Sequence, residues 1–236
     1  MATLLELRDE IILSAGIKGN PDFPPTLLNR KINHAQRYVQ TELNGLGMKK
    51  WETSQSITAG LTAAAYNSSS NNVKKVAVGQ TYFLNMLESP KSIIHIETND
   101  SSDPPNYGIA REVPIQNFEE SLANTYLVPT TKKPIFIRLS GYVWLAPVGI
   151  TVATAHYYKA VADLSTDASS TEIPIEFEDF IIKKTVLEIK IMKGEVQDVQ
   201  LKQAELDKEI QSSYEKFLGK MQEIQRVDIT NKGKLS

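Results

Sequence analysis

The stretch EIPIEFEDFIIKKTVLEI, Glu172 to Ile189, separates two textures in the sequence. Short apolar runs broken by Pro, Gly and Ser precede it, and an almost unbroken series of helix formers follows it to about residue 224. Pro174 suits a first helical turn, and Glu176, Glu178 and Asp179 lie where a helix dipole stabilises negative charge. We therefore expect a helix with a broad apolar face at the centre of the core. Its apolar residues are Phe177, Phe180, Ile181, Leu187 and Ile191, backed by Ile182, Val186 and Ile189.

Hydrophobic periodicity predicts three further helices. The first covers residues 3 to 15, and the second follows Pro24-Pro25. The core row of the second comprises Leu28, Ile32, Ala35, Val39, Leu43 and Leu46, and its other faces carry Arg30, Lys31, Gln36, Arg37 and Gln40. The last helix runs from Glu195 to about Ile224, with charged residues on the faces opposite its apolar row.

The middle of the chain has the texture of a β-sheet. Short β-branched and aromatic runs alternate there with Gly, Pro, Asn and Ser clusters, which is typical of strands and turns. Expected strands are Val73 to Val78, Thr81 to Leu87, Ser92 to Thr98, Ile109 to Ile115, Pro134 to Leu139, Tyr142 to Ala146 and Val152 to Lys159. Ser140-Gly141 suits a tight hairpin turn, and QNFEESLAN, residues 116–124, indicates a short helix. Residues 63–72 and 99–108 are expected to be polar loops too poor in apolar residues to pack.

These patterns predict an α+β protein in which N- and C-terminal helices form one bundle and a large β-rich insertion lies between the second and third bundle helices. The expected parts are residues 1–50 and 171–224 for the bundle, 51–170 for the insertion and 225–236 for a C-terminal tail.

Composition excludes several kinds of chemistry. Among 236 residues, 26 Lys and Arg balance 28 Asp and Glu, so net charge gives no argument for nucleic-acid affinity. The absence of Cys removes disulfides and thiolate chemistry. We find no secretion signal, no apolar window approaching the ~20 residues of a membrane helix, and no phosphate-binding glycine loop. The sequence predicts no catalytic, cofactor or metal site, and no enzymatic activity.

The histidines His34, His95 and His156 are spread over three expected elements. None is assigned a carboxylate or second His at metal-binding spacing, so each is interpreted as a surface or structural residue. Aromatic residues in the strands could form a stacking platform for single-stranded nucleic acid, but they lack the interleaved Lys and Arg of such a surface.

Several segments together resemble the head-to-tail adaptor (head completion, or connector) proteins of tailed bacteriophages. These are LLNRKINHAQRYVQTEL at 27–43, YVWLAPVG at 142–149, ATAHYYKAVADLS at 153–165 and the opening stretch with its long charged helix. The resemblance spans most of the chain. It implies a structural virion protein of the neck, assembled in the host cytoplasm, without cofactor or membrane.

What the resemblance implies is a homo-oligomeric ring, commonly dodecameric, beneath the portal protein. Such a ring continues the DNA channel, passes genomic DNA without sequence readout and offers the tail proteins an attachment site. The tail of the chain is expected either to be a frayed terminus or, if ordered, to dock on the portal through Arg226, Val227, Ile229, Lys232 and Leu235. The polar face of the last helix is expected to meet the neighbouring subunit through Gln200, Gln203, Asp207, Gln211 and Tyr214.

Three alternatives remain at this point. The chain could be another tail-side ring, collar or stopper component of the same particle. It could be a small hydrolase with a site in the β insertion, for which a deep pocket joining a His to a carboxylate would be the sign. It could also be a single-strand-binding module, which a filter-binding assay at low salt would reveal.

Overall fold

The computed structural model describes the chain except residues 68, 69, 71, 80, 84, 88–91, 103, 125 and 233–236, and for residues 222–232 it describes the helix alone. The chain divides into two compact units. One, here called the helical unit, comprises Met1–Lys49 and Val161–Ser236, and the other, the β unit, comprises Lys50–Ala160. The mixed α+β class predicted from the sequence is confirmed.

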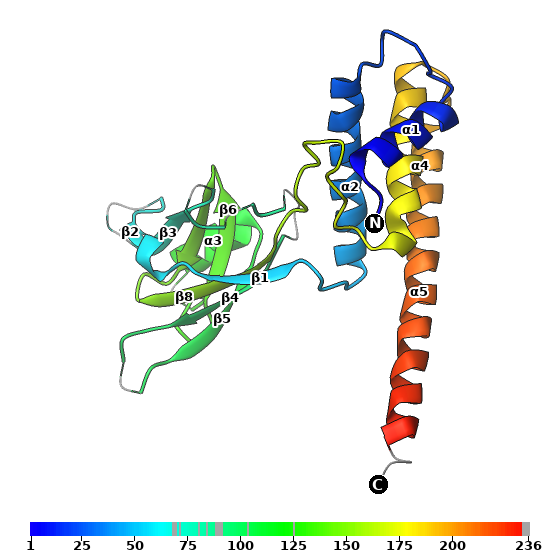
Figure 1. Ribbon diagram of the computed structural model, residues 1–236. Helices are drawn as coiled ribbons and strands as arrows, with labels where there is room; N and C mark the ends of the chain where they lie inside the picture. The colour runs from blue at the N-terminus through cyan, green and yellow to red at the C-terminus, as the bar shows by residue number, and fades with distance from the viewer. Residues whose placement is uncertain are drawn as a thin grey trace. The chain divides into compact units, whose positions relative to one another are not determined.

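The helical unit contains α1 (Leu4–Ser14), α2 (Pro25–Gly45), α4 (Glu178–Met192) and α5 (Val199–Lys232). Helix α2 packs against α1, α4 and α5, and α4 packs against α1 and α5. Figure 1 shows α2, α4 and α5 running side by side, with α1 crossing near them. Segments from the two ends of the sequence therefore share one core.

The two N-terminal helices begin where their sequences predict, and they bury the predicted apolar faces. Thr3 and Glu6 form a capping box at the start of α1, which satisfies backbone N–H groups that a helix start leaves unpaired. Pro25 occupies the first turn of α2. The fully buried residues include Leu4, Leu7 and Ile11 of α1 and Leu28, Ile32, Ala35, Val39 and Leu43 of α2.

The prediction that Gln36 and Gln40 lie on the polar faces of α2 is wrong. Gln36 and Gln40 are completely buried, although their spacing suggested solvent. The Gln36 side-chain amide donates to the carbonyl of Ala162 (2.9 Å), and the Gln40 side-chain oxygen accepts from the N–H of Val161 (3.0 Å). Leaving such buried groups unpaired would cost about 1–3 kcal/mol each. These amides therefore fasten the segment after residue 160 to α2.

Helices α4 and α5 differ from expectation at their ends. A 3-10 turn, η2 (Ile175–Phe177), precedes α4, and Ile191, expected in the core, is 36% exposed. Helix α5 begins at Val199 and continues to Lys232, past its expected end near Ile224. Among residues 199–221, the part of α5 whose burial is described, the buried residues are Leu206, Ile210 and Tyr214.

The β unit contains an eight-stranded sheet with the order β1-β8-β4-β5-β6-β7-β3-β2. The strands are β1 (Glu52–Ser56), β2 (Thr62–Ala64), β3 (Val73–Ala77), β4 (Ile93–Asn99), β5 (Tyr107–Glu112), β6 (Ile135–Leu139), β7 (Tyr142–Ala146) and β8 (Val152–Tyr158). All neighbours pair antiparallel except β5 and β6, which share a short parallel ladder. Figure 1 shows that the sheet curls on itself. Its concave side encloses an apolar cluster that includes Ile57, Phe83, Ile96, Phe136 and Tyr157.

Two further contacts complete the β unit. Helix α3 (Ile115–Ala123) corresponds to the predicted short helix. It packs against β6 and buries Phe118. Where the chain enters and leaves the unit, β1 pairs with β8, and the N–H of Lys159 donates to the carbonyl of Trp51 (2.9 Å).

The predicted hairpin turn is confirmed. Ser140 and Gly141 both have positive φ, +51° and +77°, and they join β6 to β7. Two consecutive left-handed residues match the right-handed twist of the flanking strands.

The predicted strand over Thr81–Leu87 is wrong. Its described residues form bends, a turn and one isolated bridge between Met86 and Lys159, with positive φ at Phe83 and Asn85. The backbone N–H of Phe83 donates to the Gln55 side chain (2.8 Å), and the Phe83 ring packs beside Tyr157. Phe83 therefore enters the core from a loop and not from a strand.

The expected polar loop at 63–72 also needs correction. Ala63 and Ala64 belong to β2, and Tyr66 is buried with edge contacts to Phe118 and Trp144. Ala64 and the Tyr66 ring therefore attach this segment to the core. None of the helices in the described part of the chain combines the length and apolar character that a membrane span requires.

Candidate functional site

The residues predicted for subunit contact lie on two sides of α5. Gln203, Asp207 and Tyr214 are engaged inside the helical unit. The Tyr38 hydroxyl donates to Asp207 and accepts from the Gln203 amide, and Lys184 Nζ donates to the Gln203 side-chain oxygen at 2.6 Å. Tyr214 is 6% exposed. These three residues therefore connect α5 to its own subunit.

Burial acts on the charges of this polar network in opposite directions. It raises the pKa of Asp207 and lowers the pKa of Lys184, because desolvation disfavours each charged form. The Lys184 ammonium also lies over the Tyr38 ring, 4.3 Å from its centroid. The network is thus a structural link between α2, α4 and α5.

In residues 199–221, the part of α5 whose side chains are described, the opposite face makes no such intrasubunit hydrogen bonds. Gln200 is exposed, and the exposed Gln211 bonds only along its own helix, to Glu215 at 3.2 Å, among the hydrogen bonds of the described residues. Around Gln211 runs an exposed stripe with alternating spacings of three and four. We call it the α5 stripe, and it comprises Leu201, Ala204, Lys208, Gln211, Glu215 and Leu218. Leu201 and Leu218 are 56% and 41% exposed, so the stripe presents apolar groups near both ends.

The residues predicted to dock on a portal lie at the C-terminal end. Arg226, Val227, Ile229 and Lys232 belong to the last turns of α5, and Leu235 lies outside the described residues. The expected separate tail is therefore helical as far as Lys232.

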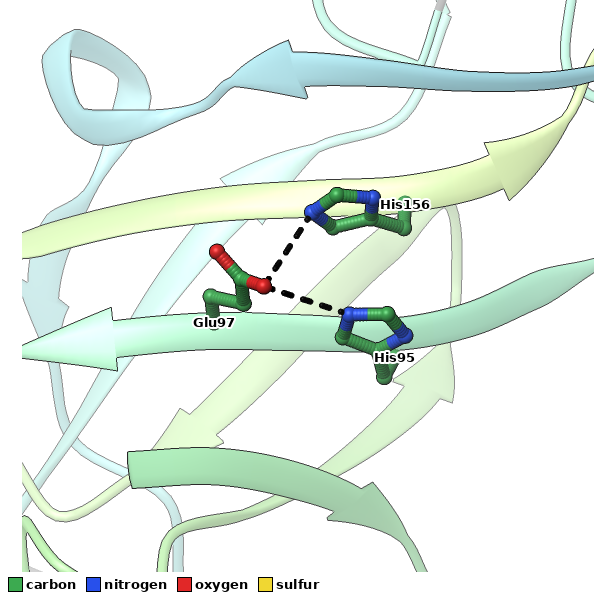
Figure 2. Close-up of side chains that lie close together, drawn as sticks. All are labelled: His95, Glu97 and His156. Carbon is green, nitrogen blue, oxygen red and sulfur yellow. Dashed lines mark ion pairs between the residues drawn. The ribbon is translucent and has the colours of Figure 1, made fainter. Parts of the chain in front are cut away.

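A cluster that the sequence analysis missed lies on the β unit. His95 and Glu97 come from β4 and His156 from the neighbouring β8. Glu97 Oε1 is 3.6 Å from His95 Nε2 and 3.7 Å from His156 Nε2. The two imidazole rings stack with centroids 4.3 Å apart. Figure 2 shows both rings directing a nitrogen towards the one carboxylate.

The sheet register explains this juxtaposition. His95 lies opposite His156 in the antiparallel ladder, so both side chains share one face. The register shifts between Ile93 and His95, which marks a β-bulge. Ile93 and Ile96 are both buried, and a regular strand would turn residues three apart to opposite faces. The extra residue therefore lets His95 and Glu97 share the outer face while both isoleucines enter the core.

This arrangement overturns the interpretation that no His has a carboxylate or second His at metal-binding spacing. The pattern His95-x-Glu97 on an expected strand was the available signal, because residues two apart share a strand face. The pairing of His156 with His95 could not be predicted from the sequence, because it depends on which strands become neighbours in the sheet.

A groove of about 860 Å³ begins beside the cluster. It is lined by Glu97, Thr98, Tyr107, Gly108, Ile109, Arg111, Lys132, Lys133, Pro134 and Ile135. The hydrolase alternative called for a deep pocket joining a His to a carboxylate. Here the groups meet on the open outer face, and the Glu97 side chain is 58% exposed.

Comparison with known proteins assigns the whole chain to one family. A search of curated proteins finds no match. The family model described as "SU10 adaptor protein" matches residues 2–232, which include the β unit, all of α5 and the helical unit except Met1 and residues 233–236. With nearly its full length covered, the chain belongs to the SU10 adaptor protein family and is a bacteriophage structural adaptor.

Proposed function

We propose that this protein is the head-to-tail adaptor of a tailed phage. It forms a ring of identical subunits, dodecameric by the resemblance, beneath the portal, where it continues the DNA channel and provides the attachment site for the tail. The match of the family model over residues 2–232 carries this proposal. The agreement of four separate sequence segments with the connector pattern supports it.

The α5 stripe is proposed as one side of the contact between neighbouring subunits. A heterologous ring needs two different patches on each subunit, and a long helix with one face occupied internally has the other available. Leu201 and Leu218 supply exposed apolar area, while Lys208 and Glu215 supply opposite charges. Gln211 belongs to this stripe and Gln200 flanks it. Of the five contact residues predicted from the sequence, these two remain proposed for the subunit interface.

The C-terminal end of α5 is proposed to dock on the portal. The last residues of α5 whose burial is described, 218–221, are exposed, so this part of the helix is available to a partner. In this arrangement the β unit faces the tail proteins, and DNA passes through the ring without base-specific contacts. The near-neutral net charge supports that passage, because a lumen that bound phosphates tightly would oppose DNA movement.

The proposal is tested by measuring native mass with and without portal rings from the same phage. We expect the isolated chain to be a monomer or weak oligomer, and a stable stoichiometric complex to form on the portal. Removal of residues 225–236 is expected to abolish attachment while leaving the helical circular dichroism signal and unfolding temperature of the remaining chain nearly unchanged. Full attachment of the truncated chain would contradict docking through the C-terminal end.

A second variant isolates the ring contact. Replacing Leu201 and Leu218 by Lys is expected to prevent ring closure on the portal. Leu13→Lys is the matched control, because Leu13 is 72% exposed in α1 of the same unit. Normal rings from the double variant would eliminate the α5 stripe as the interface.

The remaining candidate is a tail-side collar or stopper ring of the same particle. It predicts that the chain binds completed tails and fails to bind portals. The same binding experiment with purified tails separates the two roles.

A further inference from the structure

We propose that His95, Glu97 and His156 bind one divalent transition-metal ion, with Zn²⁺ as its best representative. These three residues offer two imidazole nitrogens and a carboxylate oxygen within 4.8 Å of one another on one face of the sheet. The proposal concerns the β unit alone and holds whether or not the adaptor ring forms as proposed above.

The separations match ligands of a shared ion better than they match direct bonds. At 3.6 and 3.7 Å, the two nitrogen-to-oxygen distances exceed a normal hydrogen bond. Zn²⁺ binds His nitrogen and carboxylate oxygen at about 2.0–2.2 Å, and near-tetrahedral angles then place neighbouring ligand atoms roughly 3.4 Å apart. The two separations between Glu97 and the imidazoles are therefore within a few tenths of an ångström of the spacing expected for ligands of one ion.

The hydrogen bonding of His156 also indicates a missing partner. Its Nε2 atom is buried and has no hydrogen-bond partner among the described residues, and it is directed towards Glu97. A buried polar atom without a partner costs free energy that coordination of a cation would recover. A neutral imidazole presents a lone pair at that nitrogen, which is the form that a metal binds.

The scaffold holds the three ligands in place. They project from two paired strands in the interior of the sheet, since β8 lies between β1 and β4, and β4 lies between β8 and β5. The bulge in β4 directs His95 outwards beside its partner, and bulges commonly re-aim side chains at functional sites. Ligands on strands are positioned more firmly than ligands on loops.

The ligand set also restricts the kind of ion. Two imidazoles with one carboxylate favour Zn²⁺, Ni²⁺, Cu²⁺ or Fe²⁺ over Mg²⁺ and Ca²⁺, which prefer a shell of oxygens. Three protein ligands leave at least one coordination position for water, and the exposure of Glu97 leaves the ion a path to reach the site.

The test uses the full-length chain, stripped of metal with chelator and titrated with Zn²⁺ by calorimetry. Co²⁺ then serves as a spectroscopic probe, because bound nitrogen and oxygen ligands change its visible absorption. We expect one equivalent of Zn²⁺ per chain. His95→Gln, Glu97→Gln and His156→Gln are each expected to weaken binding about tenfold or more.

His34→Gln is the matched control. His34 also contacts a glutamate, Glu188, but it lies in the helical unit, where lysines share that carboxylate. It is expected to leave the affinity and the Co²⁺ spectrum unchanged. Thermal unfolding in chelator, measured for every variant, shows whether each remains folded before metal is added.

Absence of one-to-one binding by the folded wild-type chain would overturn the proposal. So would binding that His156→Gln or Glu97→Gln leaves unchanged, whatever the result for His34→Gln. Mg²⁺ binding at the same site with equal affinity would overturn the assignment to a transition metal.

Discussion

The two units each place histidine beside glutamate, but they surround the pair differently. In the helical unit, the Glu188 side chain is 11% exposed and faces His34 at 2.8 Å, Lys31 at 3.0 Å and Lys184 at 3.9 Å. In the β unit, Glu97 is 58% exposed and faces two imidazoles at longer distances. Fixed positive charges already compensate Glu188, whereas Glu97 has only imidazoles within ion-pair distance among the described residues. The surrounding charges, more than the residue types, distinguish a structural ion pair from a ligand set.

The largest expected effect is on Glu188. Glu188→Gln leaves the largely buried side chain of Lys184, which is 11% exposed, without this carboxylate, so we expect a loss of about 3 kcal/mol in the free energy of unfolding. The matched substitution Glu97→Gln is expected to change it by less than about 0.5 kcal/mol in chelator, because that side chain is exposed. Urea unfolding of the two variants measures the difference. Equal losses of unfolding free energy would contradict the distinction between a structural ion pair at Glu188 and an exposed ligand at Glu97.

Added Zn²⁺ is expected to stabilise the β unit alone. At a hundredfold excess over its Kd, a ligand specific for the folded state adds about 2.7 kcal/mol. The chain has no Cys, which limits competing binding by the unfolded state. Differential scanning calorimetry should show the shift in the wild type and its loss in His156→Gln. Stabilisation that persists in that variant would place the ion elsewhere.

His34→Gln is expected to cost only about 0.5 kcal/mol. His34 is 65% exposed, and Lys31 and Lys184 continue to compensate Glu188 after it is removed. Urea unfolding checks the value. A loss as large as that of Glu188→Gln would mean that the imidazole, rather than the lysines, carries this cluster.

The smallest expected effect is the pH dependence contributed by Asp207. Burial raises its pKa above the ordinary value of 3.8, so the folded state holds this proton more tightly than the unfolded state does. Its contribution to stability is therefore full below pH 3.8 and declines as the pH rises through the raised pKa. Asp207→Asn, which still accepts from Tyr38, is expected to remove this decline. Unfolding free energies measured between pH 3 and 7 test it, and identical slopes in both proteins would contradict it.

Sequence reasoning succeeded where one element decides its own structure. The rows of α1 and α2 and the Ser140-Gly141 turn depend on local spacing and local backbone preference, and they appear as predicted. It failed where a distant partner decides. Strand β1, with the sequence ETSQS, has no apolar alternation and forms because β8 offers it a ladder. Gln36 and Gln40 are buried because backbone groups more than a hundred residues away need partners.

The candidate sites divide in the same way. The exposure of Gln200 and Gln211 follows from helix periodicity, while the engagement of Gln203 and Asp207 depends on a tyrosine of α2. For the metal cluster, the spacing of His95 and Glu97 was visible in the sequence. The bulge and the neighbouring strand that supply His156 were not, because neither has a local sequence signature.

The ladder between β1 and β8 has a consequence for how such a protein can change. Since Trp51 and Lys159 are hydrogen-bonded neighbours, the whole sheet begins and ends at one point of the chain. Joining the two flanking segments directly, or inserting another domain whose termini are adjacent, requires only a short connection with a small closure entropy. The β unit can therefore be removed or replaced as one continuous segment while the helical unit is retained.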